Sequence, residues 1–579
     1  MKNISLKTIA ILAVALATVG CIKETFPKGS TVTAGQLNAT EYELAYRVNA
    51  IPGAMMMSGT AGYANSYGFH ADYGMPAIHL MTECMLEDLT VMGELGYFWF
   101  GAFFQNLAQG SDYIYCAYFW DCYYAWIKLA NDAIALAGEI TDETDEQTRA
   151  LAGQAHAYRA MFYLDLARLY EPKDNKILPL SDEIKGLTVP IVTENTNEDM
   201  AENNGRASRE DMYAFIFEDL ALAEKYLDPT DAAYTNPTLA AVYGLYARAY
   251  LELGAADDQV NKTAYAEAAK YARKAIETSG KTPLTEAQWH DPKSGFNDGG
   301  TNNSWIWGLS LPVENASNII TNVAHLAPEA TWGYSILSLP GASKAFYDQI
   351  SEMDFRKRSW LDETGTWNSL LTDIYDPTST KYQFAGNKEA LEYFHYQTIN
   401  LQTGQVKPYI NIKFRPAMGD CIDYTQGNCA DHVLMRVEEM YFIEMEATLY
   451  TKGLAEARAL LDNFMKTYRY PTYSSKVTAI SDPGFLNEML LQKRIEFWGE
   501  GILFFDYKRL NKGITRGYNG TNFPSVARFN CEGRSPQWNI CITRGEFQSN
   551  KGIMEMVDEQ VVMDKNNPDP TGKLPLWTE

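Results

Sequence analysis

Several motifs that indicate catalysis or metal binding are missing from this sequence. No two cysteines have the C-x-x-C spacing of a zinc ribbon, and no H-E-x-x-H pair occurs among the seven histidines. The sequence also has no G-x-S-x-G turn, which positions the nucleophile of many serine hydrolases, and no phosphate-binding glycine loop. These absences exclude the commonest zinc, serine-hydrolase and nucleotide-binding sites, and we expect no catalytic cofactor.

Positive charge is also in short supply. The chain has 49 lysines and arginines against 73 aspartates and glutamates, which gives a net charge of −24. A nucleic-acid partner needs a basic face for its phosphates, so we expect none, and the same imbalance disfavours electrostatic adhesion to anionic lipid. Hydrophobic residues make up 46% of the 579 residues, which is enough for a substantial core and excludes a disordered chain.

Long apolar runs are rare, and the longest lies close to the first residue. Residues 9–19 form an apolar run that is too short to cross a bilayer as a helix. Lys2 and Lys7 precede this run and small residues follow it, in the order of a secretory signal. Small residues directly before Cys21 resemble a bacterial lipoprotein signal, so we expect removal of residues 1–20 and lipid attachment at Cys21.

This signal predicts an exported protein that is held to a membrane by lipid. Acyl chains contribute roughly 0.8 kcal/mol per buried methylene, so several chains together hold a protein firmly. No other segment approaches about 18 consecutive apolar residues, and we expect a water-soluble body behind a polar tether of residues 21–40. The alternative is an ordinary secretory signal that a cysteine follows by chance.

Cysteine is scarce as well, with eight residues in the whole chain. Seven remain once Cys21 is assigned to lipid. Exported proteins can form disulfides. The two closest plausible pairs lie in loop-like segments, and they join Cys421 with Cys429 and Cys531 with Cys541.

Residues 236–280 show the clearest pattern that is present, a pair of antiparallel helices. Asn236 suits the N-cap of the first helix, and Gly254 suits a left-handed cap at its end. The second helix is expected over residues 263–279, with Gly280 as its stop. The predicted buried faces consist of Leu239, Val242, Tyr243, Tyr246, Tyr250 and Leu253 in the first helix and of Tyr265, Ala268, Ala272, Ala275 and Ile276 in the second. This pattern is typical of a tetratricopeptide unit, which needs neighbouring pairs to cover its apolar face.

Helical periodicity predicts two helical regions that an insertion separates. The regions are residues 41–280 and residues 431–579, the latter ending in a loop-rich tail, and the insertion is residues 281–430. Further helices are predicted over residues 120–138, 147–170, 208–226, 433–450, 454–468 and 483–500. The insertion is rich in Gly, Asn, Asp, Pro and Ser and holds six of the twelve tryptophans. We therefore expect a mainly α-helical protein of tetratricopeptide-like pairs, with a large loop-rich insertion that carries function.

Four stretches of the sequence resemble motifs of one bacterial protein family. Residues 436–447 resemble its R-x-A-E-x-Y-L-x-x-A-E-A helix, and residues 494–509 resemble its R-x-E-x-x-x-E-G-x-R-x-x-D-L-x-R segment. Residues 157–170 resemble the R-A-x-x-Y-x-x-L-x-x-x-Y helix, and residues 540–550 resemble the I-P-x-x-E-x-x-x-N tail. Because these stretches cover nearly the whole mature chain in the family's order, the chain is identified as a member of the SusD/RagB outer-membrane lipoproteins of the Bacteroidetes.

The resemblance implies a SusD-like fold and a binding protein rather than an enzyme. It implies that the protein is exposed at the surface of the outer membrane, binds oligosaccharide or polysaccharide, and delivers it to a SusC-like TonB-dependent transporter. The family's helical pairs pack against that transporter. Some members take peptide instead, so a peptide-binding lid is the alternative ligand class.

Two groups of acidic residues could suggest other chemistry. Glu496 and Glu500 lie one helical turn apart, as an acid–base pair could, but Lys493 and Arg494 flank them and favour a structural charge network. A loop also carries three aspartates without the regular spacing of a calcium loop, so a structural calcium is the one metal that we keep open. These aspartates are Asp420, Asp423 and Asp431.

Aromatic residues are the best candidates for binding. A pyranose ring has a face rich in C–H groups that stacks on an aromatic ring, which contributes about 0.5–1.5 kcal/mol beyond its area. The candidate platforms are Tyr97, Trp99, Trp305, Trp307, Trp332 and Tyr334, with Asn302 and Asn303 as polar partners. Trp305 and Trp307 alternate as in a strand, so one is expected to face inward and the other outward.

Two further interpretations stay open at this point. A scaffold that only holds the transporter shut predicts that all six aromatic candidates are buried. A hydrolase predicts measurable turnover of a bound glycan. Any single tryptophan of the insertion can equally well be a core residue.

Overall fold

The computed structural model describes most of the chain after the tether. The described residues are 42–56, 69–93, 97–231, 233–313, 316, 320–375, 381–474, 481, 484–553, 556–557, 560–561 and 566–578. The chain divides into two compact units, residues 1–46 and residues 47–579, and the fold below is that of the second. The signal, the tether and Cys21 lie outside the described residues. Among the helices that are described, none is both long and apolar enough to span a bilayer.

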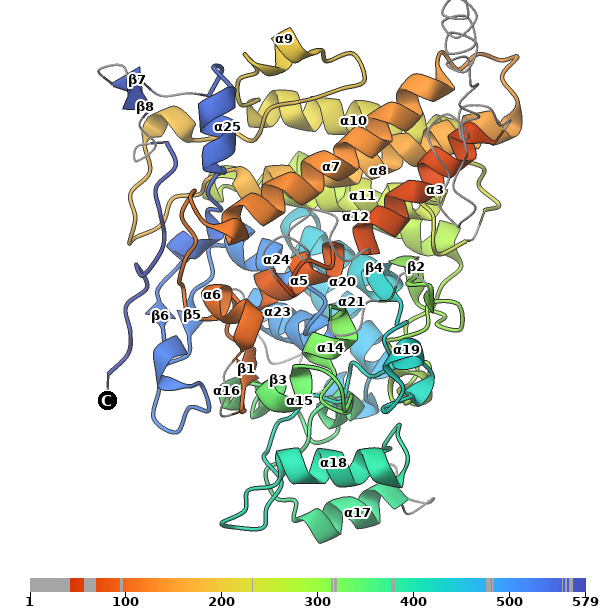
Figure 1. Ribbon diagram of the computed structural model, residues 1–579. Helices are drawn as coiled ribbons and strands as arrows, with labels where there is room; N and C mark the ends of the chain where they lie inside the picture. Colours follow the sequence, from red (N-terminus) through yellow and green to blue (C-terminus); the bar gives the residue numbers. More distant parts are fainter. Residues whose placement is uncertain are drawn as a thin grey trace, which may run out of the picture. The chain divides into compact units, whose positions relative to one another are not determined.

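Long helices form the body of the second unit, and each packs against the next in the chain (Figure 1). Contacts run from α7 to α8, from α8 to α10, from α10 to α11, from α11 to α12, from α12 to α20, and from α20 to both α21 and α23. These helices are α7 (Ile114–Ala137), α8 (Glu146–Tyr170), α10 (Arg209–Tyr226), α11 (Leu239–Gly254), α12 (Lys262–Ser279), α20 (Val437–Thr451), α21 (Leu454–Tyr468) and α23 (Gly484–Phe497). This architecture confirms the mainly α-helical prediction.

Shorter helices and small two-stranded ladders form the rest of the regular structure that is described. The shorter helices are α3 (Glu43–Met56), α5 (Met75–Glu83), α6 (Gly101–Phe104), α9 (Glu198–Ala201), α13 (Glu286–Trp289), α14 (Asn322–Leu326), α15 (Ser335–Ser338), α16 (Lys344–Tyr347), α17 (Trp367–Tyr375), α18 (Lys388–Thr398), α19 (Tyr424–Gly427), α24 (Leu503–Arg509) and α25 (Arg544–Ser549). The antiparallel two-stranded ladders pair β1 (Leu89–Val91) with β3 (Pro340–Ala342), β2 (Trp305–Leu309) with β4 (His432–Arg436), β5 (Ile514–Thr515) with β6 (Asn530–Cys531), and β7 (Met556–Val557) with β8 (Gln560–Val561).

The pair α11–α12 has the predicted helices but different caps on the first one. The Thr238 hydroxyl, not Asn236, accepts the Ala241 N–H, because Pro237 lies outside the helix rather than at its first position. Gly254 is the last helical residue and not a left-handed cap. A side chain there would meet the Tyr265 ring at 2.8 Å, so glycine allows the two helices to approach.

The second helix of the pair follows its prediction closely. Its five predicted core residues are all buried, and Gly280 takes the left-handed conformation with φ 61° directly after the helix. Ser208 likewise caps α10, because its hydroxyl accepts the Asp211 N–H at 3.0 Å. Local sequence signals therefore determine these helix ends.

The predicted helix at residues 433–450 begins later than expected. Residues 432–436 form β4, which pairs with β2 of the insertion, and α20 begins only at Val437. Gly244 of α11 explains how the ladder fits against the helices, since a side chain there would meet the Met435 sulfur at 2.2 Å. Contact between distant segments thus overrides the local helical pattern.

Glu496 and Glu500 belong to a buried charge network rather than to an acid–base pair. Arg356 and Arg469 each approach Glu496 at 2.7 Å, and Arg436 donates to Glu496 at 3.2 Å and to Glu500 at 2.9 Å. Burial alone would raise the pKa of the Glu496 carboxyl, but the three arginines outweigh burial and hold that pKa well below its usual range. The predicted charge network is confirmed, but the flanking residues are not its cations, because Lys493 pairs with Asp506 and Arg494 pairs with Asp88.

Neither of the two plausible disulfide pairs, Cys421–Cys429 and Cys531–Cys541, is formed in the described residues. All seven cysteines of this part of the chain are thiols. The Cys429 thiol donates to the Thr425 carbonyl at 3.2 Å, and the Cys541 thiol donates to the Pro568 carbonyl at 3.5 Å. Closeness in sequence therefore did not indicate which cysteines pair, because the Cys429 and Cys541 thiols are directed to backbone carbonyls rather than to another cysteine.

Candidate ligand-binding site

Three of the predicted aromatic platforms are core residues. Tyr97, Trp305 and Trp307 are buried. The ladder between β2 and β4 shifts register on both sides of Trp307, so the strand does not alternate regularly, and all five residues of β2 are buried. The expectation that one of the two tryptophans faces outward is therefore wrong, and these three rings offer no surface to a ligand.

The two predicted asparagines hold a turn. The Asn302 amide is buried, donates to the Gly295 carbonyl at 2.7 Å and accepts the Ser304 N–H at 3.0 Å. The Asn303 amide is exposed and donates to the Thr282 hydroxyl at 2.6 Å. Asn302 lines a small hollow of about 160 Å³ whose lining contains none of the predicted platforms.

Trp99 and Tyr334 meet at one place on the surface, where His70 lies between them. The ring centroid of His70 lies 4.8 Å from that of Trp99 and 5.7 Å from that of Tyr334. His70 Nδ1 is also hydrogen-bonded to the Tyr334 hydroxyl. All three side chains are partly exposed, and we call them the aromatic cluster. The sequence interpretation did not select His70.

Buried residues beneath the aromatic cluster hold its rings in place. His325 stacks between Tyr73 and Tyr334, with centroid distances of 5.3 Å and 5.1 Å. Its Nε2 donates to the His70 carbonyl at 3.1 Å, and Tyr97 donates to the His325 carbonyl at 3.3 Å. Burial lowers the pKa of His325 to about 3, so this ring is neutral at physiological pH. Tyr97 thus supports the cluster from the core instead of forming part of its surface.

Trp332 belongs to a neighbouring group of side chains. Its indole N–H donates to the Asn428 side chain at 3.0 Å, and its ring packs over Gly427, where a side chain would meet it at 2.4 Å. It packs against a small apolar group that includes Val323 and Ala327. Trp332 is partly exposed, but one edge of the ring is committed to these contacts.

A hollow of about 570 Å³ lies beside Trp99, which forms part of its wall. Its wall combines aromatic with polar residues. The lining residues are Phe69, Trp99, Ser111, Asp112, Tyr113, Ile114, Tyr115, Ala117, Thr543, Arg544, Gly545 and Gln548. The first turn of α7 and the start of α25 therefore enclose it together, and we call it the Trp99 hollow.

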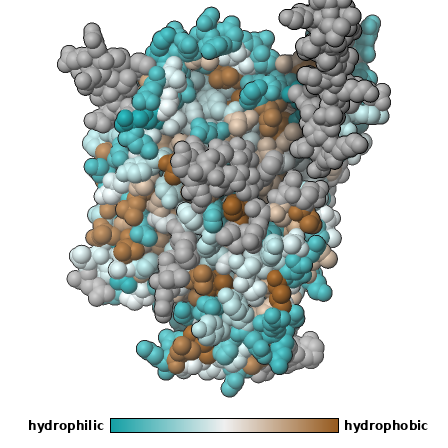
Figure 2. Space-filling model, in the orientation of Figure 1, coloured by the Kyte–Doolittle hydropathy of each residue, from teal (hydrophilic) through white to brown (hydrophobic). Residues whose placement is uncertain are grey.

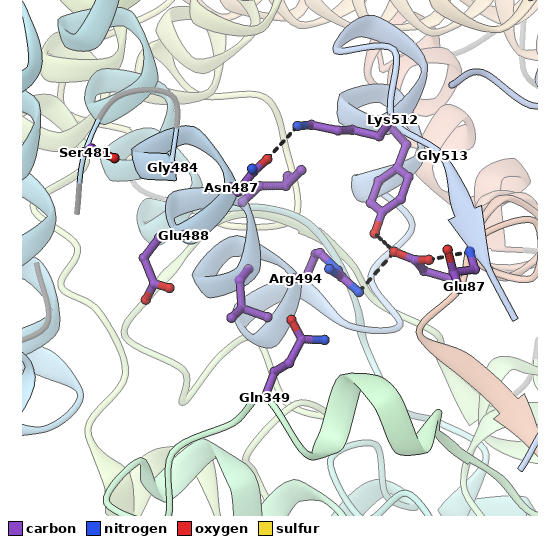
Figure 3. A pocket seen from close by; sticks show the side chains of 13 residues that line it. Glu87, Gln349, Ser481, Gly484, Asn487, Glu488, Arg494, Lys512 and Gly513 are labelled. Carbon is purple, nitrogen blue, oxygen red and sulfur yellow. Dashed lines mark hydrogen bonds and ion pairs between the residues drawn. The ribbon is translucent and has the colours of Figure 1, made fainter. Parts of the chain in front are cut away.

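A second and larger hollow, of about 670 Å³, lies beside α23 and is mainly polar (Figure 3). Several of its charged groups already have partners: Arg494 lies 3.3 Å from Glu87, and Lys512 donates to the Asn487 side chain at 2.9 Å. The Tyr507 ring in its wall is buried. Without an exposed aromatic face this hollow lacks the surface on which a sugar ring stacks, so the Trp99 hollow is the better candidate.

One face of the molecule has a surface of mixed hydropathy. On the face shown in Figure 2, hydrophobic residues form small groups that hydrophilic residues separate. A site that combines single aromatic rings with polar groups is consistent with such a surface and differs from the extended apolar patch of a permanent protein interface.

The three aspartates considered for calcium do not share a ligand set. Asp420 and Asp423 cap turns of their own loop, and Asp431 accepts the Tyr234 hydroxyl at 2.7 Å. In the part of the chain that the structure describes, no group of three or more His, Cys, Asp or Glu residues is arranged to hold a metal ion.

Comparisons with known proteins agree with this architecture. Residues 81–251 match a family model described as "Starch-binding associating with outer membrane", and residues 341–571 match the model of the SusD family. SusD-like protein P2 of Formosa agariphila is 23% identical over 452 residues, which cover 75% of this chain and 79% of the relative. The chain belongs to the SusD/RagB family.

Solved structures show the same fold. A SusD-like carbohydrate binding protein from Bacteroides vulgatus aligns with a TM-score of 0.63 at 21% identity, over 88% of this chain and 96% of the other. Surface glycan-binding protein A from Bacteroides thetaiotaomicron, solved with laminarihexaose, aligns with a TM-score of 0.57 at 17% identity, over 88% and 98% of the two chains. The names of these two solved proteins describe them as binding carbohydrate or glycan.

Proposed function

We propose that this protein binds oligosaccharide or polysaccharide at the cell surface, without cleaving it, and delivers it to a SusC-like TonB-dependent transporter. The aromatic cluster and the Trp99 hollow form the proposed binding site. The observation that carries the proposal is the meeting of two partly exposed rings, Trp99 and Tyr334, on either side of His70 and next to a hollow with a polar wall.

The physical chemistry of such a site suits reversible capture. Each aromatic platform contributes about 0.5–1.5 kcal/mol beyond its buried area. Two platforms with several hydrogen bonds give a binding free energy of roughly −4 to −8 kcal/mol, which corresponds to millimolar to micromolar dissociation constants. Affinities in this range allow a ligand to be released to a transporter after it is captured.

The membrane part of the proposal rests on the sequence and the family. The family model is described as associating with the outer membrane, and residues 1–21 resemble a lipoprotein signal. Lipid attachment at Cys21 would keep the mature chain, with its net negative charge, at a membrane that it would not otherwise bind. The chain would then need no catalytic group, because its task is to hold a ligand close to the transporter.

Isothermal titration of the full chain in detergent against a panel of oligosaccharides tests this function. We expect at least one glycan to bind, and Trp99→Ala to weaken that binding about tenfold, as the loss of one platform predicts. Tyr396→Ala is the matched control, because this tyrosine is 71% exposed on α18 and belongs to neither part of the proposed site.

Three other outcomes would each point to a different function. Binding of peptides with no binding of any glycan would favour the peptide-binding lid. If the protein binds neither peptide nor glycan but binds the transporter tightly, a scaffold would be favoured. Accumulation of shortened products from a bound glycan would show that the protein is an enzyme.

A further inference from the structure

An ion pair joins the two polar segments that enclose the Trp99 hollow. Arg544 Nη2 donates to Asp112 Oδ2 at 2.8 Å, and Arg544 Nε also contacts Asp112 Oδ1, so the contact is bidentate. The backbone N–H of Arg544 donates to the Ser111 carbonyl at 3.0 Å and fixes the two segments against each other. Both charged side chains nevertheless remain open to solvent, with exposed fractions of 56% for Asp112 and 48% for Arg544.

We propose that the Asp112–Arg544 pair is the polar recognition element of the Trp99 hollow, and that it selects an uncharged saccharide with neighbouring hydroxyl groups over one that carries carboxylates. This inference rests on the proposed function, because it names the chemical class of the ligand for the same site.

The two side chains keep unused hydrogen-bonding capacity while they are paired. A carboxylate can accept about four hydrogen bonds, and a guanidinium has five N–H donors. The bidentate contact uses two of each. One hydroxyl of a sugar can therefore donate to Asp112 while a neighbouring hydroxyl accepts from Arg544, and the ion pair stays intact. Each of these bonds involves a charged partner and is stronger than a bond between neutral groups.

A carboxylate on the ligand would have to compete with Asp112 for Arg544. To bind Arg544 in a bidentate manner it must displace Asp112, which then lies unpaired beside a second negative charge. The chain as a whole is also strongly acidic, with a net charge of −24, and offers no compensating field. The neutral pair thus rejects an acidic sugar, although an arginine lies in the wall.

The aromatic part of the wall supplies the complementary contact. Trp99 lines this hollow and also belongs to the aromatic cluster, so a sugar ring that stacks on it lies within reach of both sets of groups. Tyr113, whose ring is exposed, lies one residue from Asp112. A flat C–H-rich face and a hydroxyl-bearing edge are both properties of a pyranose, and the hollow presents a surface for each.

Titrations of the full chain with charged and uncharged hexasaccharides test the inference. The probes are hexasaccharides of glucose, mannose and galactose and, as the acidic counterpart, hexagalacturonic acid. We expect the native chain to bind at least one neutral hexasaccharide and to bind hexagalacturonic acid at least tenfold more weakly. Asp112→Asn should reverse this preference: it should lower the affinity for the neutral ligand about tenfold and raise the affinity for hexagalacturonic acid about tenfold, because Arg544 is then unneutralised.

Further variants separate recognition from folding. Arg544→Gln should lower the affinity for the neutral ligand about tenfold without raising the affinity for the acidic one. Trp99→Ala should lower the affinity for any ligand, whatever its charge. A half-exposed ion pair adds little to folding stability, so circular dichroism and melting of the Asp112 and Arg544 variants should match the native chain. Tyr396→Ala serves again as the control.

Each remaining outcome overturns either this inference alone or both proposals together. If Trp99→Ala abolishes binding while Asp112→Asn and Arg544→Gln stay within twofold of the native chain, the recognition element is wrong and the proposed function stands. Tighter binding of hexagalacturonic acid than of every neutral probe by the native chain would also overturn the inference alone. If no hexasaccharide binds, both proposals fail.

Discussion

Nδ1 of His79 and Nε2 of His432 lie 2.8 Å apart, so the two imidazoles share one hydrogen bond between α5 and β4. One nitrogen must donate and the other must accept, and both rings cannot carry a proton on these atoms at once. Burial, assisted by the positive charges of Arg248 and Arg168, lowers the pKa of His79 to about 3, and burial with the neighbouring His79 lowers the pKa of His432 as well.

This pair predicts a loss of stability in mild acid. The folded pKa values lie below the unfolded value near 6.5, so the unfolded chain binds more protons and stability falls as the pH drops below about 6.5. His325 adds to the effect, because its pKa of about 3 implies a loss of roughly 2 kcal/mol at pH 5. Urea titrations at pH 7 and pH 5 measure the difference. His432→Gln keeps a hydrogen-bond donor and an acceptor, and it should reduce the difference in unfolding free energy between the two pH values by roughly 1–2 kcal/mol. If the difference stays unchanged, protonation of this histidine pair does not cause the loss of stability.

Glu83 predicts the opposite dependence on the alkaline side. Burial raises the pKa of its carboxyl to about 8, with a smaller contribution from Asp88, although the Gly499 N–H donates to it at 3.1 Å and acts in the other direction. A raised folded pKa gives stability that is complete below pH 4.5 and is lost as the pH rises through about 8. Glu83→Gln should therefore be more stable than the native chain at pH 9, by about 2–4 kcal/mol, in urea unfolding. Equal stabilities at pH 9 would show that this carboxyl titrates normally.

Glu496→Gln should be strongly destabilising. The substitution removes the charge that three buried arginines share, which leaves them incompletely compensated at a cost of about 3–5 kcal/mol. Glu532→Gln is the control, because this glutamate forms an ion pair with Lys176 at the surface and should change stability by less than about 0.5 kcal/mol. Chemical denaturation of both variants measures the two effects. Similar values for the two would mean that the buried network contributes no more than a surface pair.

Gly254→Ala and Gly280→Ala should destabilise for different reasons. At Gly254 the new methyl group would lie 2.8 Å from the Tyr265 ring, so α11 and α12 must separate, and overpacking of this kind costs about 1–3 kcal/mol. At Gly280 no atom lies within 4 Å, and only the left-handed backbone opposes alanine, at a cost of about 1–2 kcal/mol. A second substitution, Tyr265→Leu, should rescue Gly254→Ala but not Gly280→Ala when melting temperatures are compared. If Tyr265→Leu restored the melting temperature of both glycine variants, the close approach of Gly254 to the Tyr265 ring would not explain the effect of Gly254→Ala.

Tyr334→Phe separates stacking from hydrogen bonding in the aromatic cluster. The ring remains, but its hydroxyl no longer bonds to His70 Nδ1. We expect ligand affinity to change by less than about threefold, whereas Tyr334→Ala should lower it about tenfold through the loss of a stacking face. Calorimetric titration with the glycan that binds the native chain measures both. A larger effect for the phenylalanine variant would assign the hydroxyl a direct role in binding.

Local signals in the sequence were sufficient for much of the helical frame. Apolar spacing predicted the buried face of α12, and Ser208 and Gly280 were correctly placed at helix ends. These features depend on residues within one or two helical turns. The ladder between β2 and β4 joins segments more than a hundred residues apart, and its irregular register buried Trp305 and Trp307 together, which alternation along one strand could not indicate.

The candidate site was predicted only in part, for the same reason. Trp99 and Tyr334 were selected as single aromatic residues, but their common neighbour His70 is 264 residues from Tyr334 in the sequence. No spacing rule connects such positions. Asp112 and Arg544 were missed as well, since each is an ordinary charged residue next to a helix until the fold brings them together.

The Trp99 hollow is formed by segments that lie far apart in the sequence. Besides Phe69 and Trp99, its walls come from residues 111–117 and residues 543–548, and 432 residues separate Asp112 from Arg544. Helices α7 and α8 contact each other directly, and neither includes residues 543–548. The hollow therefore forms only when these two distant segments come together, and loss of α25 would remove one of its walls.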